Sequence, residues 1–401
     1  MKLLVLVAQL GIQLEKLTSK RHYLDFNATS PFAPSVSEWL AKGDLLYANP
    51  SSVHATGKKG RKFLNEARDY IYNTFKLKPK EFDLVFHSGA SEGVNALVKG
   101  RALHLMSEGK VLNFFRSATD HSSVRNMQDD LELLGHKMTV FPVKETGEIN
   151  VEKLIEEINK AEGEVLLNFT PMNNETGVCW DWKLANKIKK ETNCLVHMDT
   201  VQTVGKVPGW NELDPEMDLF TYSAHKFGAL KGVGFSFIKK GFEFRPFISG
   251  GGQQGGLRSG TENTVGVYTI KLALEDLENE DLKEIEKARV LFESGLKKIL
   301  GDKGHIVGEK AEFRAVNTTN FITPGVISQT TAIALDIAGI DISTGSACSS
   351  GAVIPSKVLQ GMGYSDEDAM SAVRVSFGPD FNCEQVKPIL DIFEKVLSKN
   401  L

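Results

Sequence analysis

The 401-residue chain is poor in cysteine, with only Cys179, Cys194, Cys348 and Cys383. None of them forms a CxxC pair or stands near a second cysteine or histidine at the spacing of a zinc site. A chain of this length can bury a sizeable core without disulfide bonds. The cysteine usage therefore excludes a small disulfide-bonded scaffold and a zinc finger. It favours a reducing compartment, which we expect to be the cytoplasm.

The chain also lacks a basic block and a membrane-length apolar run. Its formal net charge is −4, so nucleic acid or an anionic membrane is excluded as the main partner. The apolar run in residues 1–17 is too short to span a bilayer, and Gln9 and Gln13 interrupt it. We interpret residues 1–20 as a packed N-terminal extension. The alternative is a secretory signal peptide, against which no cleavage site of the A-x-A type follows.

Short apolar runs alternate with helical patterns over the first two thirds of the chain. Leu64, Ala67, Ile71 and Phe75 lie at the spacing of one helix face, as do Leu154, Ile155 and Ile158. This alternation predicts an α/β fold with a mainly parallel sheet covered on both faces. The runs that predict strands are 83–87 (DLVFH), 110–115 (KVLNFF), 165–169 (VLLNF), 195–198 (LVHM), 219–222 (LFTY) and 234–238 (GFSFI).

The pattern changes from about Glu262. A long, charged, amphipathic helix is predicted to run to about Leu300, and its charged run at residues 275–286 is typical of a solvated helix face. Shorter strands and helices follow. The last helix places Val386, Ile389, Leu390, Phe393 and Val396 on one face. We predict a large domain over residues 27–264 and a smaller α+β domain formed by residues 1–26 and 265–401.

Two motifs follow predicted strands, where open α/β sheets bind their ligands. In SGASEGVNAL, Ser91 and Glu92 open a helix whose free amides can hold a phosphate, although many helices begin in this way for capping alone. In HMDTVQTVG, Asp199 ends a strand and Gln202 follows it. Such a carboxylate can pair with a protonated ring nitrogen and such an amide can donate to a phenolate oxygen. On its own, Asp199 fits a helix cap better.

A third motif, YSAHKFGALKGVG, brings Ser223, His225 and Lys226 together at the end of a strand. A lysine in a turn is normally a solvated charge, but one held near an anionic cofactor can form a Schiff base. Pyridoxal 5'-phosphate needs such a lysine, a carboxylate for its ring nitrogen and donors for its phosphate. The order of the three motifs along the chain favours this cofactor.

The stretch STGSACSSG places Cys348 in a small, polar, glycine-rich loop. A structural cysteine usually lies in an apolar run, where it is buried as a small hydrophobe. Taken alone, this spacing fits a chance loop cysteine better than a catalytic thiol. The remainder of the chain decides between these two interpretations.

Together with further motifs, the sequence resembles the cysteine desulfurases of the NifS/IscS-like group, within the class V aminotransferase family and fold type I of the pyridoxal phosphate enzymes. The resemblance covers nearly the whole chain from about Arg21, and GLRSGTEN and STGSACSSG are its most specific parts. It implies a homodimer, a large domain with a seven-stranded type of sheet, and conversion of L-cysteine to L-alanine with a persulfide left on Cys348. The motifs are YLDFNATSP, NPSSVHATG, SGASE, NNETG, HMDTVQ, SAHK, GGGQQGGLRSGTEN, STGSACSSG and VRVSFG.

The resemblance also implies a role for each site residue. Lys226 would be the Schiff-base lysine, Asp199 the partner of the ring nitrogen and His121 a stacked ring that helps to move protons. Arg374 and Asn174 would bind the substrate carboxylate, Arg374 as a bidentate fork. The other residues that it implies are Ala90, Ser91, Gln202, Ser223, His225 and Thr261 for the cofactor, with Thr261 from the neighbouring subunit, and Asn27 for the substrate.

The resemblance leaves several points open. The sulfur acceptor would be a scaffold for iron–sulfur clusters or an enzyme of tRNA thiolation, and no metal site is expected in this chain. The alternatives are a class V aminotransferase, a selenocysteine lyase, or a degenerate subunit that only binds partners. Leu230 stands where the family often has proline, which predicts a less rigid turn after Lys226. The chain also ends without the extended tail of housekeeping members, which puts scaffold docking through such a tail in doubt.

Overall fold

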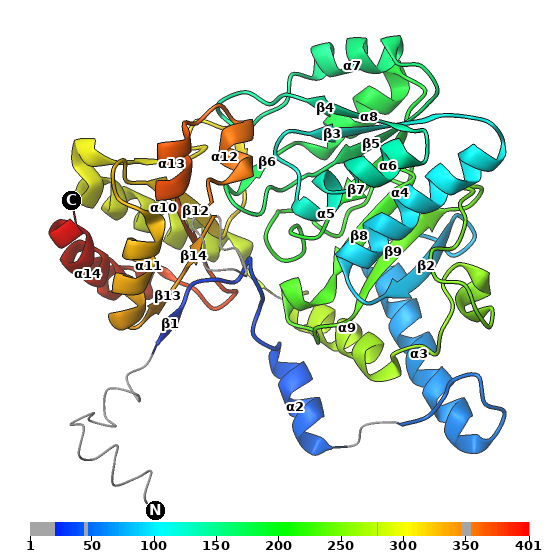
Figure 1. The fold of residues 1–401 in the computed structure, drawn as a ribbon. Helices are drawn as coiled ribbons and strands as arrows, with labels where there is room; N and C mark the ends of the chain where they lie inside the picture. Colours follow the sequence, from blue (N-terminus) through cyan, green and yellow to red (C-terminus); the bar gives the residue numbers. More distant parts are fainter. Residues whose placement is uncertain (1–20, 44–46, 279, 346–353, 401) are drawn as a thin grey trace, which may run out of the picture.

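The computed structural model describes residues 21–43, 47–278, 280–345 and 354–400 (Figure 1). Its central sheet has seven strands in the order β2-β9-β8-β7-β5-β3-β4, and pairing is parallel from β8 to β4. β9 runs antiparallel to both of its neighbours. The mainly parallel sheet predicted from the sequence is confirmed. The strands are β2 (Phe82–His87), β3 (Leu112–Ser117), β4 (Lys137–Phe141), β5 (Glu164–Phe169), β7 (Leu195–Asp199), β8 (Leu219–Ser223) and β9 (Gly234–Lys239).

β4 is the strand of this sheet that the sequence patterns did not predict. It lies at the edge of the sheet and pairs only with β3. Phe141 is its one buried residue, whereas Lys137 and Val140 are exposed. A half-solvated edge strand carries no continuous apolar run. Such a run is the signal that predicted the other six strands of this sheet.

Both faces of the sheet are covered by helices. Side chains alternate along the strands, so that Leu84 and Phe86 of β2 join one core while Val85 joins the other. α4 lies in the second core, and α3, α7, α8 and α9 lie in the first. The helices of this part are α2 (Pro34–Lys42), α3 (Ala55–Thr74), α4 (Ala90–Ser107), α5 (Ser122–Arg125), α6 (Gln128–Leu133), α7 (Val151–Lys160), α8 (Trp182–Glu191) and α9 (Thr264–Leu277).

A separate core gathers the C-terminal elements. α10 (Leu282–Leu300) packs on α14 (Cys383–Asn400), with Phe292 and Phe393 in contact at a 5.3 Å ring separation. Beside them lies a four-stranded sheet, β10-β12-β15-β14. The other elements here are β10 (His305–Ile306), β12 (Thr318–Ile322), β13 (Ile340–Asp341), β14 (Ser343–Thr344), β15 (Val373–Ser376), α11 (Ser328–Ile337), α12 (Lys357–Gly361), α13 (Asp366–Ser371) and η4 (Gly301–Lys303).

Two short pairings connect distant parts of the chain. β1 (His22–Tyr23) runs parallel to β13, so the start of the described chain lies beside its C-terminal part (Figure 1). β6 (Val178–Cys179) pairs with β11 (Phe313–Arg314), which links the loop after β5 to the segment before β12. These pairings hold segments that are far apart in the sequence side by side.

The predicted helix from Glu262 to Leu300 is wrong, because two helices occupy this range. α9 ends at Leu277, and α10 begins after Asp281, whose side chain caps it by accepting a hydrogen bond from Lys283 N. The buried residues of α9 belong to the core of the central sheet, and those of α10 belong to the C-terminal core. The division into two domains stays a prediction, and we propose that its boundary falls between these helices.

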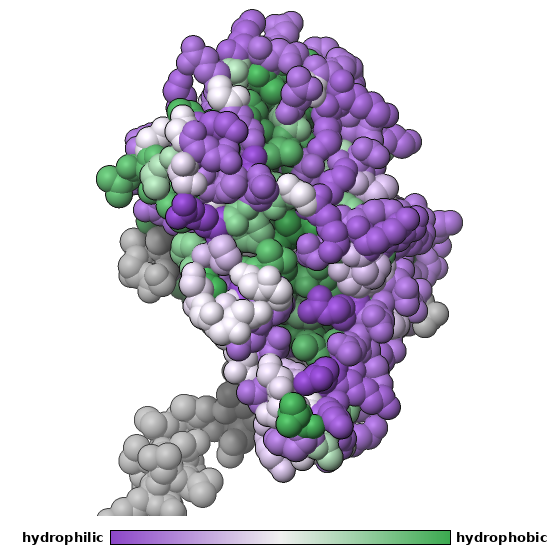
Figure 2. Space-filling model, turned by 90° about the vertical axis from the view of Figure 1, so that its right-hand side faces the viewer, coloured by the Kyte–Doolittle hydropathy of each residue, from purple (hydrophilic) through white to green (hydrophobic). Residues whose placement is uncertain are grey.

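The described surface is mainly polar. Figure 2 shows that hydrophilic residues cover most of the face on the right of Figure 1, with hydrophobic residues gathered along its middle. Among the described residues, no helix has both the length and the apolar character that crossing a membrane requires.

Candidate active site

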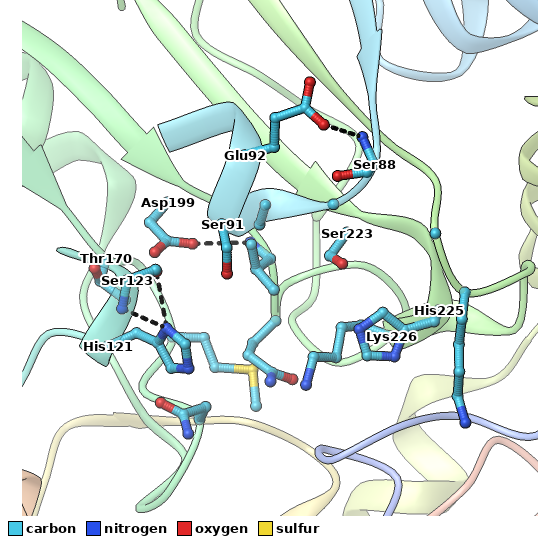
Figure 3. A pocket seen from close by; sticks show the side chains of 18 of the residues that line it. Ser88, Ser91, Glu92, His121, Ser123, Thr170, Asp199, Ser223, His225 and Lys226 are labelled. Atoms are coloured by element: carbon cyan, nitrogen blue, oxygen red, sulfur yellow. Dashed lines mark hydrogen bonds between the residues drawn. The ribbon is translucent and has the colours of Figure 1, made fainter. Parts of the chain in front are cut away.

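A cavity of about 450 Å³ opens at the carboxyl ends of the parallel strands (Figure 3). Asp199 is the last residue of β7, Ser223 is the last of β8, and Thr170 directly follows β5. Carboxyl ends of neighbouring parallel strands share one edge of the sheet, so side chains that follow them converge there. The predicted residues that line this cavity are Ala90, Ser91, His121, Asn174, Asp199, Gln202, Ser223, His225 and Lys226.

The N-terminus of α4 forms one end of the cavity. Its N-cap is Gly89, and no side chain among the described residues caps the helix, so the first amides, at Ala90 and Ser91 on the cavity wall, have no capping partner. Ser223 and His225 lie opposite (Figure 3). The pKa of His225 falls to about 4, because of burial first and then the charge of Lys226. A helix N-terminus with hydroxyl and imidazole groups around it suits a phosphate.

Glu92 holds the start of α4 in place. From the sequence, only a role in opening this helix could be assigned to it. It accepts a hydrogen bond from Ser88 N at 2.8 Å and forms an ion pair with Arg258 at 2.9 Å. Burial acts to raise the pKa of Glu92, but the bonds from Arg258 and Ser88 outweigh it and hold the pKa at about 2. The carboxylate is therefore ionised at any pH at which the enzyme would work, and the helix start is held in place.

Lys226 lies at the centre of the cavity on the short helix η2 (Ala224–Phe227), directly after β8. Its Nζ donates to the carbonyls of Asn27 and Ala28, at 2.8 Å each. Burial, and after it the positive charge of Arg374, lower the pKa of Lys226 to about 8. A lysine that loses its proton this readily has an amine available as a nucleophile near neutral pH.

The turn that follows Lys226 is held from two sides. Gly228 adopts φ +98°, and a Cβ there would lie 2.9 Å from Ala33 N, so this position requires glycine. Leu230 N donates to Thr269 Oγ1 at 3.2 Å, a bond that a proline could not form. The leucine thus provides an anchor of its own in the turn that we predicted to be less rigid.

Asp199 lies deep in the cavity, with its Oδ1 accepting from Val201 N at 3.3 Å. Burial raises its pKa to about 7, and the nearby carboxylate of Asp120 adds to this effect. Asp120 is itself buried and accepts from Thr170 Oγ1 at 2.7 Å and Asn168 Nδ2 at 3.0 Å. A buried carboxylate without a cationic partner in contact is a strong acceptor for a protonated ring nitrogen.

His121 stands on the cavity wall at the start of α5 (Figure 3). Its Nδ1 accepts from Ser123 N at 3.1 Å and lies 2.8 Å from Ser123 Oγ. A backbone amide can only donate, so the neutral ring carries its proton on Nε2. Desolvation of the ring by the surrounding protein, followed by the charges of Lys226 and Arg125, lowers the pKa of His121 to about 4. The ring is therefore neutral at pH 7.

Arg374 and Asn27 lie behind the cavity rather than in its lining. Arg374, on β15, is 6% exposed and donates from Nη2 to Asp25 Oδ1 at 2.7 Å and from Nη1 to Asn174 O at 3.1 Å. Asn27 is 1% exposed and donates to Thr318 Oγ1 at 2.8 Å. Asp25 is a residue of this site that sequence reasoning missed.

The remaining predicted residues are Thr261 and Cys348. Thr261 lines a different hollow, beside Arg258 and Glu262. Cys348 lies outside the described residues. On the described side of its segment, Glu175 Oε2 accepts from Ser356 Oγ at 2.5 Å, and a Cβ on Gly345 would lie 2.9 Å from the same oxygen. Glu175 follows the cavity residue Asn174, so Gly345 and Ser356, which flank Cys348 in the sequence, both lie against a neighbour of a cavity residue.

The other three cysteines are free and poorly suited to thiolate chemistry. Cys179 and Cys194 are buried, and burial raises the pKa of Cys179 to about 12. Burial also raises the pKa of Cys194 and Cys383. A thiol needs a lowered pKa to react as a nucleophile at neutral pH. These cysteines therefore fit a packing role.

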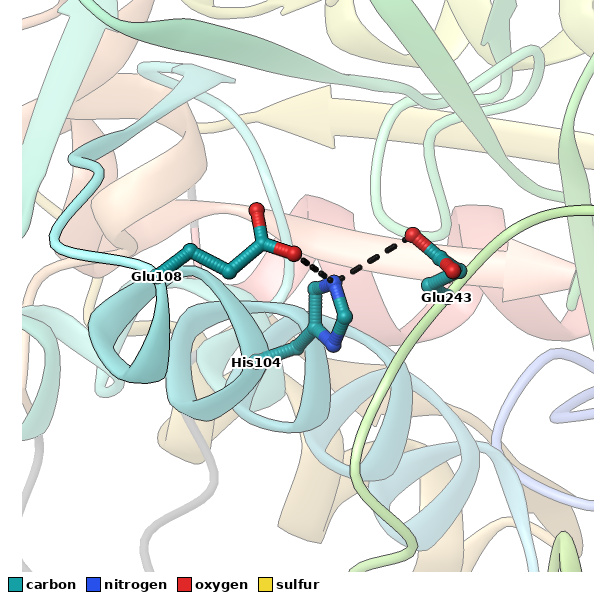
Figure 4. Close-up of side chains that lie close together, drawn as sticks. All are labelled: His104, Glu108 and Glu243. Carbon is teal, nitrogen blue, oxygen red and sulfur yellow. Dashed lines mark ion pairs between the residues drawn. The ribbon is translucent and has the colours of Figure 1, made fainter.

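A histidine with two glutamates forms a second cluster at the far end of α4 (Figure 4). His104 Nε2 lies 3.3 Å from Glu108 Oε1 and 3.4 Å from Glu243 Oε2. Lys110 binds the other oxygen of Glu108 at 2.7 Å. His104 lies fourteen residues beyond Ala90, roughly 20 Å along the helix from the cavity. We interpret the cluster as surface ion pairs around a histidine in the last turn of a helix.

Comparisons with known proteins agree with this arrangement. A family model described as aminotransferase class-V matches residues 22–389. The chain is 33% identical over 383 residues to the cysteine desulfurase IscS of Dictyoglomus turgidum, covering 94% of both proteins. It is 32% identical over 388 residues to the IscS of Clostridium botulinum strain Hall, covering 95% of both.

Solved structures give the same result. A NifS-like protein superposes with a TM-score of 0.83 at 31% identity and covers 94% of this chain and all of its own. The structure titled SspA in complex with cysteine superposes with a TM-score of 0.74 at 26% identity and covers 89% of this chain and 99% of its own. The chain belongs to the aminotransferase class V family, whose members use pyridoxal 5'-phosphate. The two IscS relatives are both named cysteine desulfurases.

The cavity fits this cofactor by its donor set. The uncapped start of α4, with Ser223 and His225, can hold the phosphate. The buried carboxylate of Asp199 suits the ring nitrogen, and Lys226, whose amine is easily deprotonated, suits the aldehyde carbon.

Proposed function

We propose that this enzyme is a cysteine desulfurase that converts L-cysteine to L-alanine and leaves a persulfide on Cys348. One observation carries the proposal. Lys226, Asp199 and His121 line one cavity, and Glu175, the neighbour of the cavity residue Asn174, is approached by both Gly345 and Ser356, which flank Cys348 in the sequence. An aminotransferase also requires the lysine and the aspartate, but its reaction does not require a cysteine on a loop.

Pyridoxal 5'-phosphate, when bound, supplies an electron sink for the negative charge that develops at the substrate Cα. Asp199 would keep the ring nitrogen protonated, because a carboxylate in contact with that nitrogen favours its charged form. Gln202 would donate from Nε2 to the ring hydroxyl oxygen. The amides of Ala90 and Ser91, with Ser223 and His225, would hold the phosphate, and Thr261 would reach it from a second subunit.

The substrate carboxylate would be bound by Arg374 and Asn174. Asn27 would help to position them, because its side chain donates to the same Asn174 carbonyl as Arg374 and its own carbonyl accepts from Lys226. Arg374 Nε has no partner among the described residues, and its Nη1 reaches only a carbonyl oxygen, so the guanidinium keeps donors for an anion. Lys226 would take the Cα proton once its amine is free. His121 would exchange its Nε2 proton with the reacting groups, since its Nδ1 is held by Ser123.

Sulfur transfer requires a thiolate at Cys348. Its Sγ attacks the substrate sulfur, a new S–S bond forms, and the substrate Cβ–S bond breaks with its electron pair left on carbon. That carbon then takes a proton and becomes the methyl group of alanine. The substrate carbon is reduced and the transferred sulfur is oxidised to the persulfide level, so no outside oxidant is needed. A later acceptor thiol or a reductant removes the sulfur.

We also propose a homodimer located in the cytoplasm that passes sulfur to an iron–sulfur scaffold or to an enzyme of tRNA thiolation. Thr261 supports the dimer because it does not line the cavity of its own chain. The three described cysteines are all free, which supports a reducing compartment. Sedimentation of the purified protein tests the dimer directly.

Product analysis tests the reaction itself. The purified protein with cofactor and L-cysteine should release sulfide and alanine in equal amounts when a reductant is present, with no keto acid added. Turnover that depends on a keto acid would assign the protein to the aminotransferases. Release of selenide from selenocysteine without activity on cysteine would assign it to the selenocysteine lyases.

A further inference from the structure

Lys206 is a buried lysine that the proposed mechanism does not use. It lies four residues after Gln202 in the turns that follow β7, and it is 6% exposed. Its Nζ donates to Gln202 Oε1 at 2.8 Å. Among the described residues, no carboxylate forms an ion pair with Lys206. A lysine buried in this way normally costs stability, so its presence calls for a reason other than stability.

Gln202 continues a hydrogen-bonded chain from Lys206 to Lys226. Gln202 Nε2 donates to Asn27 O at 3.0 Å, and Lys226 Nζ donates to that same carbonyl at 2.8 Å. The two lysines thus meet the same carbonyl, one directly and one through the amide. Gln202 and Lys226 both line the main cavity.

This chain fixes which way the Gln202 amide faces. A lysine can only donate when it meets an amide oxygen, and a carbonyl oxygen can only accept. If the amide were turned over, its NH₂ group would face the Lys206 amine and its oxygen would face Asn27 O. The contact with Asn27 O would then be repulsive in every case, and the contact with Lys206 would be repulsive when its amine is protonated. Oε1 therefore faces Lys206, and one of the two N–H groups on Nε2 remains for the cavity after Asn27 has taken the other.

We propose that Lys206 is a positioning residue: it holds the Gln202 amide so that an Nε2–H group faces the cavity and donates to the ring hydroxyl oxygen of bound pyridoxal phosphate. This inference rests on the role proposed above for Gln202. Lys206 acts through Gln202 and contacts no reacting atom. Burial first, and then the charges of Lys226 and Arg374, hold the pKa of Lys206 well below its usual value, yet either form of the amine can donate to Oε1.

Three variants test this role. Lys206→Met keeps the length of the side chain and removes the donor, and replacing a buried charge by an apolar group of similar size is usually tolerated. Lys206→Arg keeps a donor, and a second cavity of about 340 Å³ beside Lys206 gives room for the larger group. Gln202→Ala removes the amide. Lys240→Met is the control, because Lys240 is an exposed lysine paired with Asp83.

The main readout is the pH midpoint of the cofactor absorption band in the loaded protein without substrate. A donor to the ring oxygen favours its ionised form, so loss of the donor should raise this midpoint. We expect Lys206→Met and Gln202→Ala each to raise it by about half a unit to one unit and to weaken cofactor binding about three- to tenfold. A variant that combines Lys206→Met with Gln202→Ala should have the same midpoint as Gln202→Ala alone. The midpoint of Lys206→Arg should lie close to that of the parent.

Two results would overturn the proposal. The first is an unchanged midpoint in Lys206→Met while the midpoint of Gln202→Ala shifts. The second is a double variant whose shift equals the sum of the two single shifts, because Lys206 would then act independently of Gln202. Circular dichroism of each variant confirms folding. The spectral readout needs no turnover, so a parent that binds cofactor but releases no sulfide would contradict the proposed reaction and leave this test intact.

Discussion

Arg374 and Asp25 form an ion pair with 2.7 Å between Nη2 and Oδ1, although they lie 349 positions apart in the chain. Both side chains are largely buried, with 7% and 19% of their surfaces exposed. The pair holds the plane of the guanidinium while Nη1 donates to Asn174 O at 3.1 Å. An arginine fixed in this way needs little reorganisation to bind a carboxylate.

Substitution of this arginine should act on substrate binding more than on turnover. We expect Arg374→Lys to raise the KM for L-cysteine by about ten- to hundredfold, because a charged hydrogen bond contributes roughly 1.5–3 kcal/mol. Steady-state kinetics on cofactor-loaded protein measure this. Asp25→Asn, which leaves the guanidinium in place, should give a smaller rise. A loss confined to kcat in Arg374→Lys would contradict carboxylate binding by this residue.

The carboxyl of Asp199 should make the cofactor-free protein less stable as the pH rises. Its pKa is about 7 when folded, against an ordinary value of 3.8. Between these values the unfolded chain releases a proton that the folded protein retains, so the free energy of unfolding falls by up to about 1.4 kcal/mol per pH unit. The loss is complete above pH 7. Below the ordinary value the two states bind the same proton.

Asp199→Asn removes this titration. The cofactor-free variant should melt at a higher temperature than the parent at pH 8, and the two should converge toward pH 4. Its affinity for pyridoxal phosphate should fall, since the partner of the ring nitrogen is lost. Asp83→Asn, a substitution at an exposed carboxylate, serves as the control. A variant that melts below the parent at pH 8 without cofactor would contradict the burial cost.

A buried charge cluster should dominate the stability of the C-terminal core. Glu293 on α10 binds Arg289 at 2.9 Å and Arg314 at 2.8 Å, and all three side chains are less than a tenth exposed. Glu293→Ala would leave Arg314 buried without a carboxylate and Arg289 with only Glu286, whose Oε1 lies 4.0 Å away. We expect a cost of about 3–5 kcal/mol. Urea denaturation of the cofactor-free protein measures this. Glu284→Ala, at an exposed site, should cost less than about 0.5 kcal/mol, and an equal loss in both variants would contradict the prediction.

Residues that follow strands could be located from the sequence. Asp199, Ser223 and Lys226 stand directly after continuous apolar runs, and parallel strands bring their carboxyl ends to one edge. The same reasoning placed Ser91 at a helix start. Local pattern was sufficient in these cases, because the chain segment that carries each residue also positions it.

Other parts of the site depend on contacts that local pattern does not contain. Asp25 acquires its role only through Arg374, and Asp120 only through the strands beside it. Lys206 looks like any solvated lysine in the sequence, and only its burial against Gln202 distinguishes it. The break between α9 and α10 was hidden for a related reason: its charged residues fit a solvated helix face as well as a turn.

The persulfide on Cys348 is the central claim, and mass spectrometry after a single turnover tests it most directly. Cofactor-loaded protein should be mixed with one equivalent of L-cysteine without reductant, alkylated and digested, beside Cys348→Ala and the control Cys383→Ala. We predict that the peptide containing Cys348 gains the mass of one sulfur atom while one alanine forms per site, and that Cys348→Ala binds cofactor but forms neither product. Full alanine formation by Cys348→Ala, or sulfur found on another cysteine of the parent, would contradict this account.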